Sequence, residues 1–240
     1  MHSINHRGYS AIAPENTLAA YRLSKEKGFS TVECDVRFTS DGHAVLLHDG
    51  TIDRTSNGTG KLSEMTLEEV RAYDFGSWKS EAYQGEKIPT FTEFISLCKE
   101  LKLSPYIELK SVSAEQVSTL MDVVNEYGVH ERATWISFSL ETLRTVIKVD
   151  ETARCGYLTE KIDSQVIDAA KSLQTGKNEV FLNCYYGVLT KKEILLCKMA
   201  ALPLEVWTVN EEKTLLSLDD YVSGVTSDCL IAEQLLSDKE

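Results

Sequence analysis

The chain has 240 residues, of which 42% are hydrophobic and 26% are charged, and its formal net charge at pH 7 is −12. This length and composition are ordinary for one globular α/β barrel domain. The negative charge argues against a nucleic-acid surface, which needs a basic footprint, and no apolar run reaches the ~18 residues of a membrane-spanning helix.

Two features bear on the cellular compartment. The first residues, MHSINHRG, do not show the basic and then apolar order of a secretion signal, so we expect a cytoplasmic protein. Six cysteines are present without C-x-x-C spacing, which predicts free, mostly buried thiols and no zinc site. They are Cys34, Cys98, Cys155, Cys184, Cys197 and Cys229.

Short apolar segments alternate with helical segments along the chain. The clearest helix covers 113–128, where Val117, Leu120, Met121 and Val124 recur at helical spacing. Eight segments are predicted to be parallel strands: 3–6, 31–36, 105–110, 134–139, 154–158, 179–183, 203–209 and 223–228. Eight βα units in one domain spanning 1–240 predict an α/β fold of the TIM (β/α)8 barrel type.

One strand-like segment, 43–48, breaks the alternation. It follows the second barrel strand through Asp41-Gly42, which is too short for a parallel crossover and predicts an antiparallel β-hairpin at the barrel mouth. A two-residue loop at this point would set Asp35 opposite His48. The stretch at about 50–87, which contains RTSNGTG and a short helix at 66–73, is expected to be a small insertion.

Acidic residues occupy one face of two neighbouring barrel strands. Alternation within TVECDVRF puts Glu33 and Asp35 on the face opposite the apolar residues, and IELK repeats this arrangement with Glu108 and Lys110. Three carboxylates in a confined mouth need cationic partners, which could be neighbouring basic side chains. Their position at the carboxyl ends of barrel strands favours a divalent metal instead, and an all-oxygen set suits Mg²⁺ or Ca²⁺.

Two histidines are expected at the same mouth. His6 closes the first strand and His48 closes the hairpin. Two imidazoles converging on an acidic cluster suggest acid–base catalysis. Arg7 would recognise phosphate oxygens in a planar, bidentate manner, and Lys110 would add a point charge.

With these residues in place, the chain resembles the glycerophosphodiester phosphodiesterase family. The matching segments follow the family's order and span nearly the whole chain: HRGYSAIAPENT, ECDVRFTSDGHAVLLHD, RTSNGTG, IPTFTEF, IELK, WTVN and GVTSD. The resemblance implies a TIM barrel with a small insertion and a divalent metal cofactor.

The resemblance also implies roles for individual residues. Catalysis would fall to His6 and His48, and the metal ligands would be Glu33, Asp35 and Glu108. The substrate-binding set would be Arg7 and Lys110 on the phosphate, Trp207 and Phe138 lining the pocket, and Glu15 and Asn16 supporting the site. Glu15 and Asn16 have a second interpretation, in which they only cap the first helix or brace its loop.

The expected reaction is metal-dependent hydrolysis of a glycerophosphodiester to glycerol 3-phosphate and an alcohol. One histidine would remove a proton from the nucleophile and the other would protonate the leaving oxygen. The sequence leaves open the order of the two histidines, and whether the nucleophile is water or the glycerol hydroxyl acting through a cyclic phosphate. No residue marks a headgroup pocket, which predicts a loosely read head alcohol.

Other functions remain alternatives at this point. A lysophospholipase D or a phosphoinositide-type phospholipase would use the same scaffold with an exposed apolar rim. An aldolase-type barrel would use Lys110 as a Schiff base but would leave both histidines unexplained. A non-catalytic phosphoglycerol-binding module would lack an acid–base residue, and none is missing. The expected partner is a small-molecule substrate, without nucleic acid or stable membrane insertion, and a homo-oligomer is possible.

Overall fold

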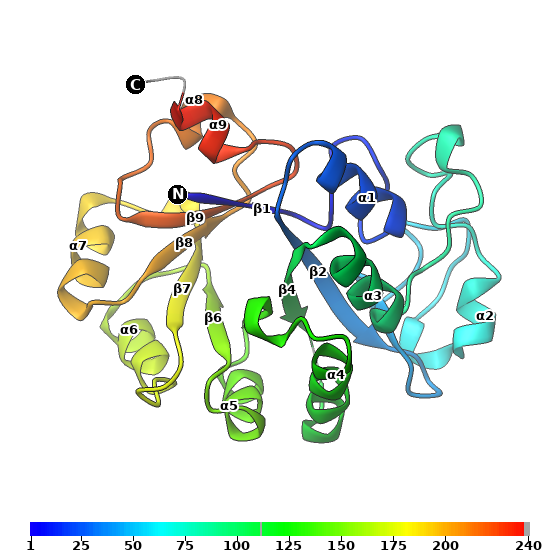
Figure 1. The fold of residues 1–240 in the computed structure, drawn as a ribbon, viewed down its shortest axis with the longest axis horizontal. Helices are drawn as coiled ribbons and strands as arrows, with labels where there is room; N and C mark the ends of the chain where they lie inside the picture. The colour runs from blue at the N-terminus through cyan, green and yellow to red at the C-terminus, as the bar shows by residue number, and fades with distance from the viewer. Residues whose placement is uncertain (111, 238–240) are drawn as a thin grey trace.

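The computed structural model describes residues 1–110 and 112–237, and its strands close into a barrel (Figure 1). Eight parallel strands follow the order β1-β9-β8-β7-β6-β5-β4-β2, and pairing of β1 with β2 closes the ring. They are β1 (His2–Asn5), β2 (Thr31–Phe38), β4 (Ser104–Leu109), β5 (Thr134–Ser137), β6 (Arg154–Thr159), β7 (Val180–Tyr185), β8 (Leu204–Trp207) and β9 (Val222–Ser227). The predicted TIM barrel is confirmed.

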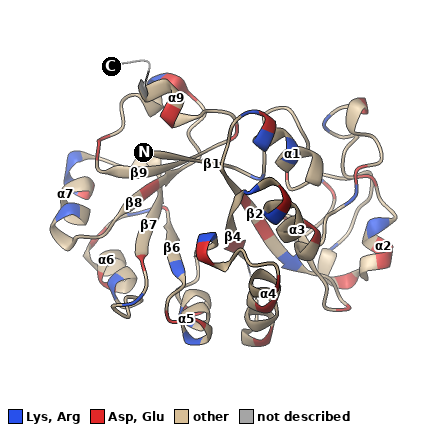
Figure 2. Ribbon diagram, viewed as in Figure 1, with Lys and Arg blue, Asp and Glu red and all other residues tan. Residues whose placement is uncertain are grey.

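Helices surround the barrel and carry mixed acidic and basic residues, whereas charge on the strands is confined to a few positions (Figure 2). The helix predicted at 113–128 is present, and a capping box of Ser113 and Gln116 begins it. In the described residues the α-helices are α1 (Leu18–Glu26), α2 (Leu67–Arg71), α3 (Phe91–Leu101), α4 (Ala114–Glu126), α5 (Leu140–Val149), α6 (Ser164–Lys171), α7 (Lys191–Ala200), α8 (Glu212–Leu215) and α9 (Ala232–Ser237).

The main hydrophobic core lies between the strands and the helices. On β2 the apolar face consists of Val32, Cys34 and Val36, which are fully buried in the same cluster as Phe94 of α3. Because side chains alternate along a strand, the intervening Glu33 and Asp35 point to the other face, into the barrel. All six cysteines are free and five are buried, as predicted.

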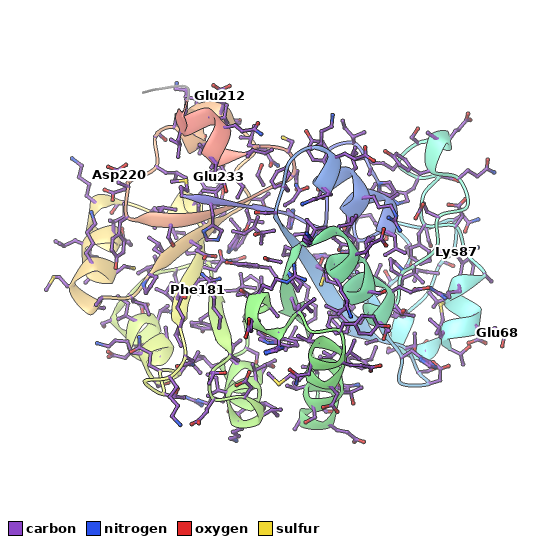
Figure 3. All side chains as sticks on the ribbon, in the orientation of Figure 1. Glu68, Lys87, Phe181, Glu212, Asp220 and Glu233 are labelled. Carbon is purple, nitrogen blue, oxygen red and sulfur yellow. The ribbon has the colours of Figure 1, made fainter. Side chains whose placement is uncertain are left out.

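The barrel interior is filled at its amino-terminal end, so the open space lies at the carboxyl ends of the strands. Glu205 is fully buried and accepts hydrogen bonds from Arg154 Nη2 at 2.8 Å and from the Tyr106 hydroxyl at 3.2 Å. An apolar layer that includes Ile4 and Phe181 is also buried inside the barrel, and Figure 3 shows Phe181 among the barrel strands.

Strand β3 (Ala44–Leu46) pairs antiparallel with β2 as expected, but the predicted register is wrong by one residue. The ladder pairs Val36 with Leu46, and the Leu47 amide donates to the Asp35 carbonyl at 3.0 Å, so Asp35 does not lie opposite His48. The hairpin loop has three residues rather than two, because the Thr39 amide already donates to the His43 carbonyl at 3.0 Å. Gly42, with φ of +85°, supplies the left-handed residue that such a loop needs.

Residues 50–87 pack a small core of their own beneath β3. Ile52, Leu62, Val70 and Phe75 are buried together with Val45 of β3. Figure 3 shows the labelled Glu68 and Lys87 on this segment, away from the barrel strands. The division into one domain with an insertion stays a prediction. Among residues 1–110 and 112–237, no helix has both the length and the apolar character needed to span a bilayer.

We expect Gly156→Ala to destabilise the barrel. A Cβ at this position of β6 would lie 2.6 Å from Phe181 Cε2 and 2.9 Å from Ile136 Cγ2, and such overpacking typically costs ~1–3 kcal/mol. Gly50→Ala is the matched control, because among residues 1–110 and 112–237 no atom beyond its own chain neighbours lies within 4 Å of the added Cβ. Urea unfolding of both variants measures the difference. Equal midpoints would contradict the packing described for the barrel interior.

Candidate active site

A cavity of about 320 Å³ opens at the carboxyl ends of the barrel strands, where TIM-barrel active sites lie. It brings together eight of the eleven residues predicted for the site: His6, Arg7, Glu33, His48, Glu108, Lys110, Phe138 and Trp207. The other three, Glu15, Asn16 and Asp35, lie behind this lining and contact it, as described below.

Three carboxylates form a buried cluster at the mouth. Register pairs Asp35 of β2 directly with Glu108 of β4, while Glu33 projects from the same face of β2. The three offer oxygens that all lie within 4.8 Å of one another, and their residues are 3%, 0% and 8% exposed in the order Glu33, Asp35 and Glu108. This all-oxygen set fits a hard divalent cation.

Two cations already contact the cluster. Lys110 Nζ lies 2.8 Å from Asp35 Oδ1 and 2.5 Å from Glu108 Oε1. Arg7 Nε lies 3.2 Å from Asp35 Oδ2, and the Arg7 amide donates to Glu33 Oε2 at 3.0 Å. The backbone of Arg7 adopts φ of +54°, a conformation that costs a non-glycine residue free energy and turns its amide and guanidinium toward the carboxylates.

The three carboxyl groups of the cluster differ in the direction of their pKa shifts. Burial would raise the pKa of Asp35, but Lys110 and Arg7 hold it below its ordinary range. Burial and the negative charge of Asp35 raise the pKa of Glu108 to about 7, and the same two causes raise the pKa of Glu33 well above its usual value. The two basic side chains therefore keep Asp35 ionised, whereas Glu33 and Glu108 favour the protonated form unless a further cation binds.

Each mouth histidine is held by an aspartate. His6 Nδ1 lies 2.7 Å from Asp228 Oδ1, and His48 Nδ1 lies 2.7 Å from Asp49 Oδ1. A carboxylate at Nδ1 favours the tautomer that keeps a proton there, which leaves Nε2 for proton exchange with a ligand. Burial lowers the pKa of His48 despite the nearby Asp35. Although the predicted hairpin register is wrong by one residue, His48 still lines the cavity, because it follows the hydrogen bond from the Leu47 amide to the Asp35 carbonyl, where the pairing of β3 with β2 ends.

The loop before α1 supports the carboxylates and the arginine. Asn16 Nδ2 donates to Asp35 Oδ2 at 2.8 Å, and Asn16 Oδ1 accepts from the Asp35 amide at 3.2 Å. The cap of α1 is Thr17, so the interpretation of Asn16 as a helix cap is wrong. Glu15 accepts from Arg7 Nη1 at 2.8 Å and also pairs with Arg54. Both residues brace the loop against the site.

The opposite wall of the cavity is aromatic. The ring of Phe138, which follows β5, meets the ring of Trp207 at the end of β8 edge to face, with centroids 6.1 Å apart. The ring of Tyr185 at the end of β7 packs against the Trp207 ring, with centroids 5.4 Å apart. Trp207 Nε1 donates to the Asn183 carbonyl at 3.2 Å, which fixes the indole.

Among the residues that contact the predicted site residues, sequence reasoning missed Asp49, Arg54, Tyr185 and Asp228. A signal existed for three of them. Asp49, Arg54 and Asp228 are charged residues inside segments already singled out, LLHD, RTSNGTG and GVTSD. Tyr185 had no such signal, because a tyrosine at the end of an apolar strand is ordinary.

The raised pKa of Glu108 predicts a pH-dependent effect of Glu108→Gln on the metal-free protein. Protonated Glu108 fits the buried site, and ionisation opposes folding as pH rises from about 4.5, its ordinary value, to about 7. In the presence of a chelator, we therefore expect the free energy of unfolding of Glu108→Gln to increase relative to that of the native protein as the pH rises across this window. Urea unfolding at pH 5 and pH 8 measures the gain, and a constant difference between the two proteins would contradict it.

Comparison with known proteins agrees with this geometry. Residues 6–233 match the model of the glycerophosphoryl diester phosphodiesterase family. The chain is 33% identical to a glycerophosphodiester phosphodiesterase of Caldanaerobacter subterraneus subsp. tengcongensis, with 88% of this chain and 86% of the relative covered.

Solved structures show the same relationship. A phosphodiesterase of Oleispira antarctica, in complex with the product sn-glycerol-3-phosphate, superimposes with a TM-score of 0.89 at 28% identity, covering 99% of this chain and 96% of the other. A glycerophosphodiester phosphodiesterase of Parabacteroides distasonis has a TM-score of 0.79 at 25% identity, covering 100% and 98%. The chain belongs to the glycerophosphoryl diester phosphodiesterase family.

Proposed function

We propose that this chain hydrolyses glycerophosphodiesters to glycerol 3-phosphate and an alcohol, with His6 and His48 as the acid–base pair. One observation carries the proposal: two histidines, each bound to an aspartate, line the same cavity as Glu33 and Glu108 of the buried carboxylate cluster. Family membership supports the reaction, and the Oleispira antarctica relative in complex with sn-glycerol-3-phosphate supports the product.

Glu33, Asp35 and Glu108 would hold the metal, and Mg²⁺ and Ca²⁺ both suit these oxygens. When bound, the metal supplies positive charge that neutralises the phosphate and stabilises the transition state. Arg7 and Lys110 line the cavity beside the cluster, so they bind the phosphate oxygens and limit its movement.

Proton transfer falls to the free Nε2 atoms of the two histidines. One Nε2 takes the proton of the nucleophile, and the other, protonated beforehand, gives its proton to the leaving oxygen. Asp228 and Asp49 keep the Nδ1 protons in place, which stabilises each imidazolium while it exists. The nucleophile is either water or the neighbouring glycerol hydroxyl.

The aromatic wall binds the organic part of the substrate. Trp207 and Phe138 offer ring faces to the glycerol carbons or to the head alcohol. Glu160, which follows β6, also lines the cavity and is exposed.

The geometry does not favour the Schiff-base alternative. A Schiff-base lysine must lose its proton before it attacks a carbonyl. Burial would lower the pKa of Lys110, but Asp35 and Glu108 raise it above its ordinary value. Lys110 therefore stays an ammonium group, which suits phosphate binding.

Two further features remain predictions. The cytoplasmic location is compatible with six free cysteines, since disulfides are rare in the reducing cytosol. A homo-oligomer is also still a prediction.

Activity should depend on a divalent metal. After exhaustive chelation we expect no release of glycerol 3-phosphate from glycerophosphocholine, and recovery on addition of Mg²⁺ or Ca²⁺. Glu33→Gln should weaken metal binding measured by calorimetry. Glu100→Gln is its control, because this residue lies in an exposed ion pair with Arg22. Full activity of the chelated protein would contradict the metal requirement.

Replacing either histidine should lower kcat while metal binding is retained. His6→Gln and His48→Gln each remove one proton-transfer group, worth ~10²–10⁴-fold in rate. The native enzyme should show a bell-shaped dependence of rate on pH, because one imidazole must be neutral while the other is protonated. Each variant should lose one limb of the bell. A variant with native kcat would remove that histidine from the mechanism.

A further inference from the structure

One arginine outside the barrel strands connects two parts of the site. Arg54 lies in the turn-rich segment after β3, and the acid–base scheme above gives it no role. We propose that Arg54 is a positioning residue that holds the imidazole of His48 and the guanidinium of Arg7 in one fixed arrangement. Its effect on catalysis rests on the function proposed above, whereas its effect on side-chain geometry does not.

Arg54 contacts two carboxylates through three of its nitrogens. Its Nε donates to Asp49 Oδ2 at 2.7 Å. On the other side, Nη1 donates to Glu15 Oε2 at 2.7 Å and Nη2 donates to Glu15 Oε1 at 2.9 Å. The second contact is bidentate, so it fixes both the position and the plane of the Glu15 carboxylate.

The same two carboxylates hold the groups that face the substrate. Asp49 uses its other oxygen, Oδ1, for His48 Nδ1 at 2.7 Å. Glu15 Oε1 also accepts from Arg7 Nη1 at 2.8 Å. The resulting sequence of contacts runs from His48 through Asp49, Arg54 and Glu15 to Arg7. Neither carboxylate can turn away from its partner without breaking a bond to Arg54.

The segment that carries Arg54 is itself well anchored. Ile52 is fully buried in the small core beneath β3, and its amide donates to the Gly60 carbonyl at 3.0 Å. Ser56 Oγ donates to the Ile52 carbonyl at 2.7 Å. Gly58 packs against this core, where a Cβ would lie 2.8 Å from Ile52 Cδ1. These contacts anchor the loop that carries Arg54.

Charge gives a second reason for an arginine at this position. Glu15 and Asp49 are negative groups next to the expected site of an anionic phosphate. Burial would raise the pKa of Glu15, but Arg54 and Arg7 keep it below its ordinary value. Arg54, followed by His48, likewise lowers the pKa of Asp49 to about 2. Arg54 therefore offsets charge that would otherwise repel the substrate.

The contribution of Arg54 to overall stability should be small. Its side chain is 45% exposed, and Asp49 is 30% exposed, so water screens these ion pairs. A positioning role in catalysis does not need a large folding contribution, because a displacement of ~1 Å can cost ~10²-fold in rate. Loss of Arg54 should therefore affect turnover far more than folding.

The first test compares Arg54→Ala and Arg54→Lys with Arg22→Ala in the full chain. Arg22 is the matched control, because its ion pair with Glu100 is exposed and involves neither of the carboxylates that Arg54 contacts. With metal present, we expect Arg54→Ala to lower kcat ~10–100-fold with a melting temperature close to that of the control. Arg54→Lys should recover only part of the loss, because an ammonium group cannot form the bidentate contact with Glu15. Native kcat in Arg54→Ala would overturn the proposal.

A double-mutant cycle tests the route of the effect. If Arg54 acts through Asp49 and Glu15, removing Arg54 should cost much less in a protein that already carries both Asp49→Asn and Glu15→Gln. A full, additive loss in that background would show that Arg54 acts elsewhere and would overturn the proposal. Arg54→Lys replaces Arg54→Ala in the cycle if the alanine variant does not fold.

A measurement without turnover separates this proposal from the proposed function. The chain has five histidines, so ¹⁵N NMR of the rings is tractable, with His48 assigned by comparison with His48→Gln. At a pH where His48 is neutral, we expect mainly the Nδ1–H tautomer in the native protein and a mixture in Arg54→Ala. An unchanged tautomer ratio would overturn positioning of His48 by Arg54. Absence of hydrolysis by the native enzyme would refute the proposed function alone.

Discussion

The site depends on one electrostatic constraint: three carboxylates are confined at the mouth of a barrel whose interior is otherwise packed. Glu33, Asp35 and Glu108 are almost fully buried, and an uncompensated buried charge costs several kcal/mol. Lys110 and Arg7 compensate only in part, as the opposite pKa shifts of Asp35 and Glu108 show. Burial therefore favours the protonated forms of Glu33 and Glu108 in the metal-free protein, and a divalent cation would stabilise their ionised forms.

The charged residues and the aromatic residues of the cavity come from different strands of the barrel. The carboxylate cluster, its two basic partners and both histidines lie on or just after β1, β2, β3 and β4, whereas Phe138 and Trp207 follow β5 and end β8. Neighbouring parallel strands bring their carboxyl ends together, so sequence-distant groups can meet without long loops. A phosphodiester has the same two-part character, with an anionic centre and an uncharged glycerol carbon skeleton. The cavity therefore matches a phosphodiester in combining charged and apolar lining residues.

Much of this could be predicted from the sequence, because periodicity and capping determine local structure. All eight barrel strands overlap the predicted segments, and the face of β2 that carries Glu33 and Asp35 follows from simple alternation. The hairpin register could not be predicted from a two-residue loop, since one additional loop residue shifts every pair. His48 reaches the cavity regardless, because the ladder ends before it and its orientation depends on the path of the chain rather than on the register.

Residues that contact the cavity-lining residues from behind were harder to predict than the residues that line the cavity. Asp49, Asp228 and Arg54 have no recognisable chemistry in isolation, because an acidic or basic residue in a loop is usually solvated. Their significance comes from distances that only the fold provides, such as the 2.7 Å between Asp228 Oδ1 and His6 Nδ1. The segment at 50–87 has a structural role here: its buried core anchors the loop of Arg54, and Arg54 contacts the two carboxylates that bind His48 and Arg7. Arg54 reaches both carboxylates from a loop, whereas side chains on the barrel strands point either into the barrel or toward the surrounding helices.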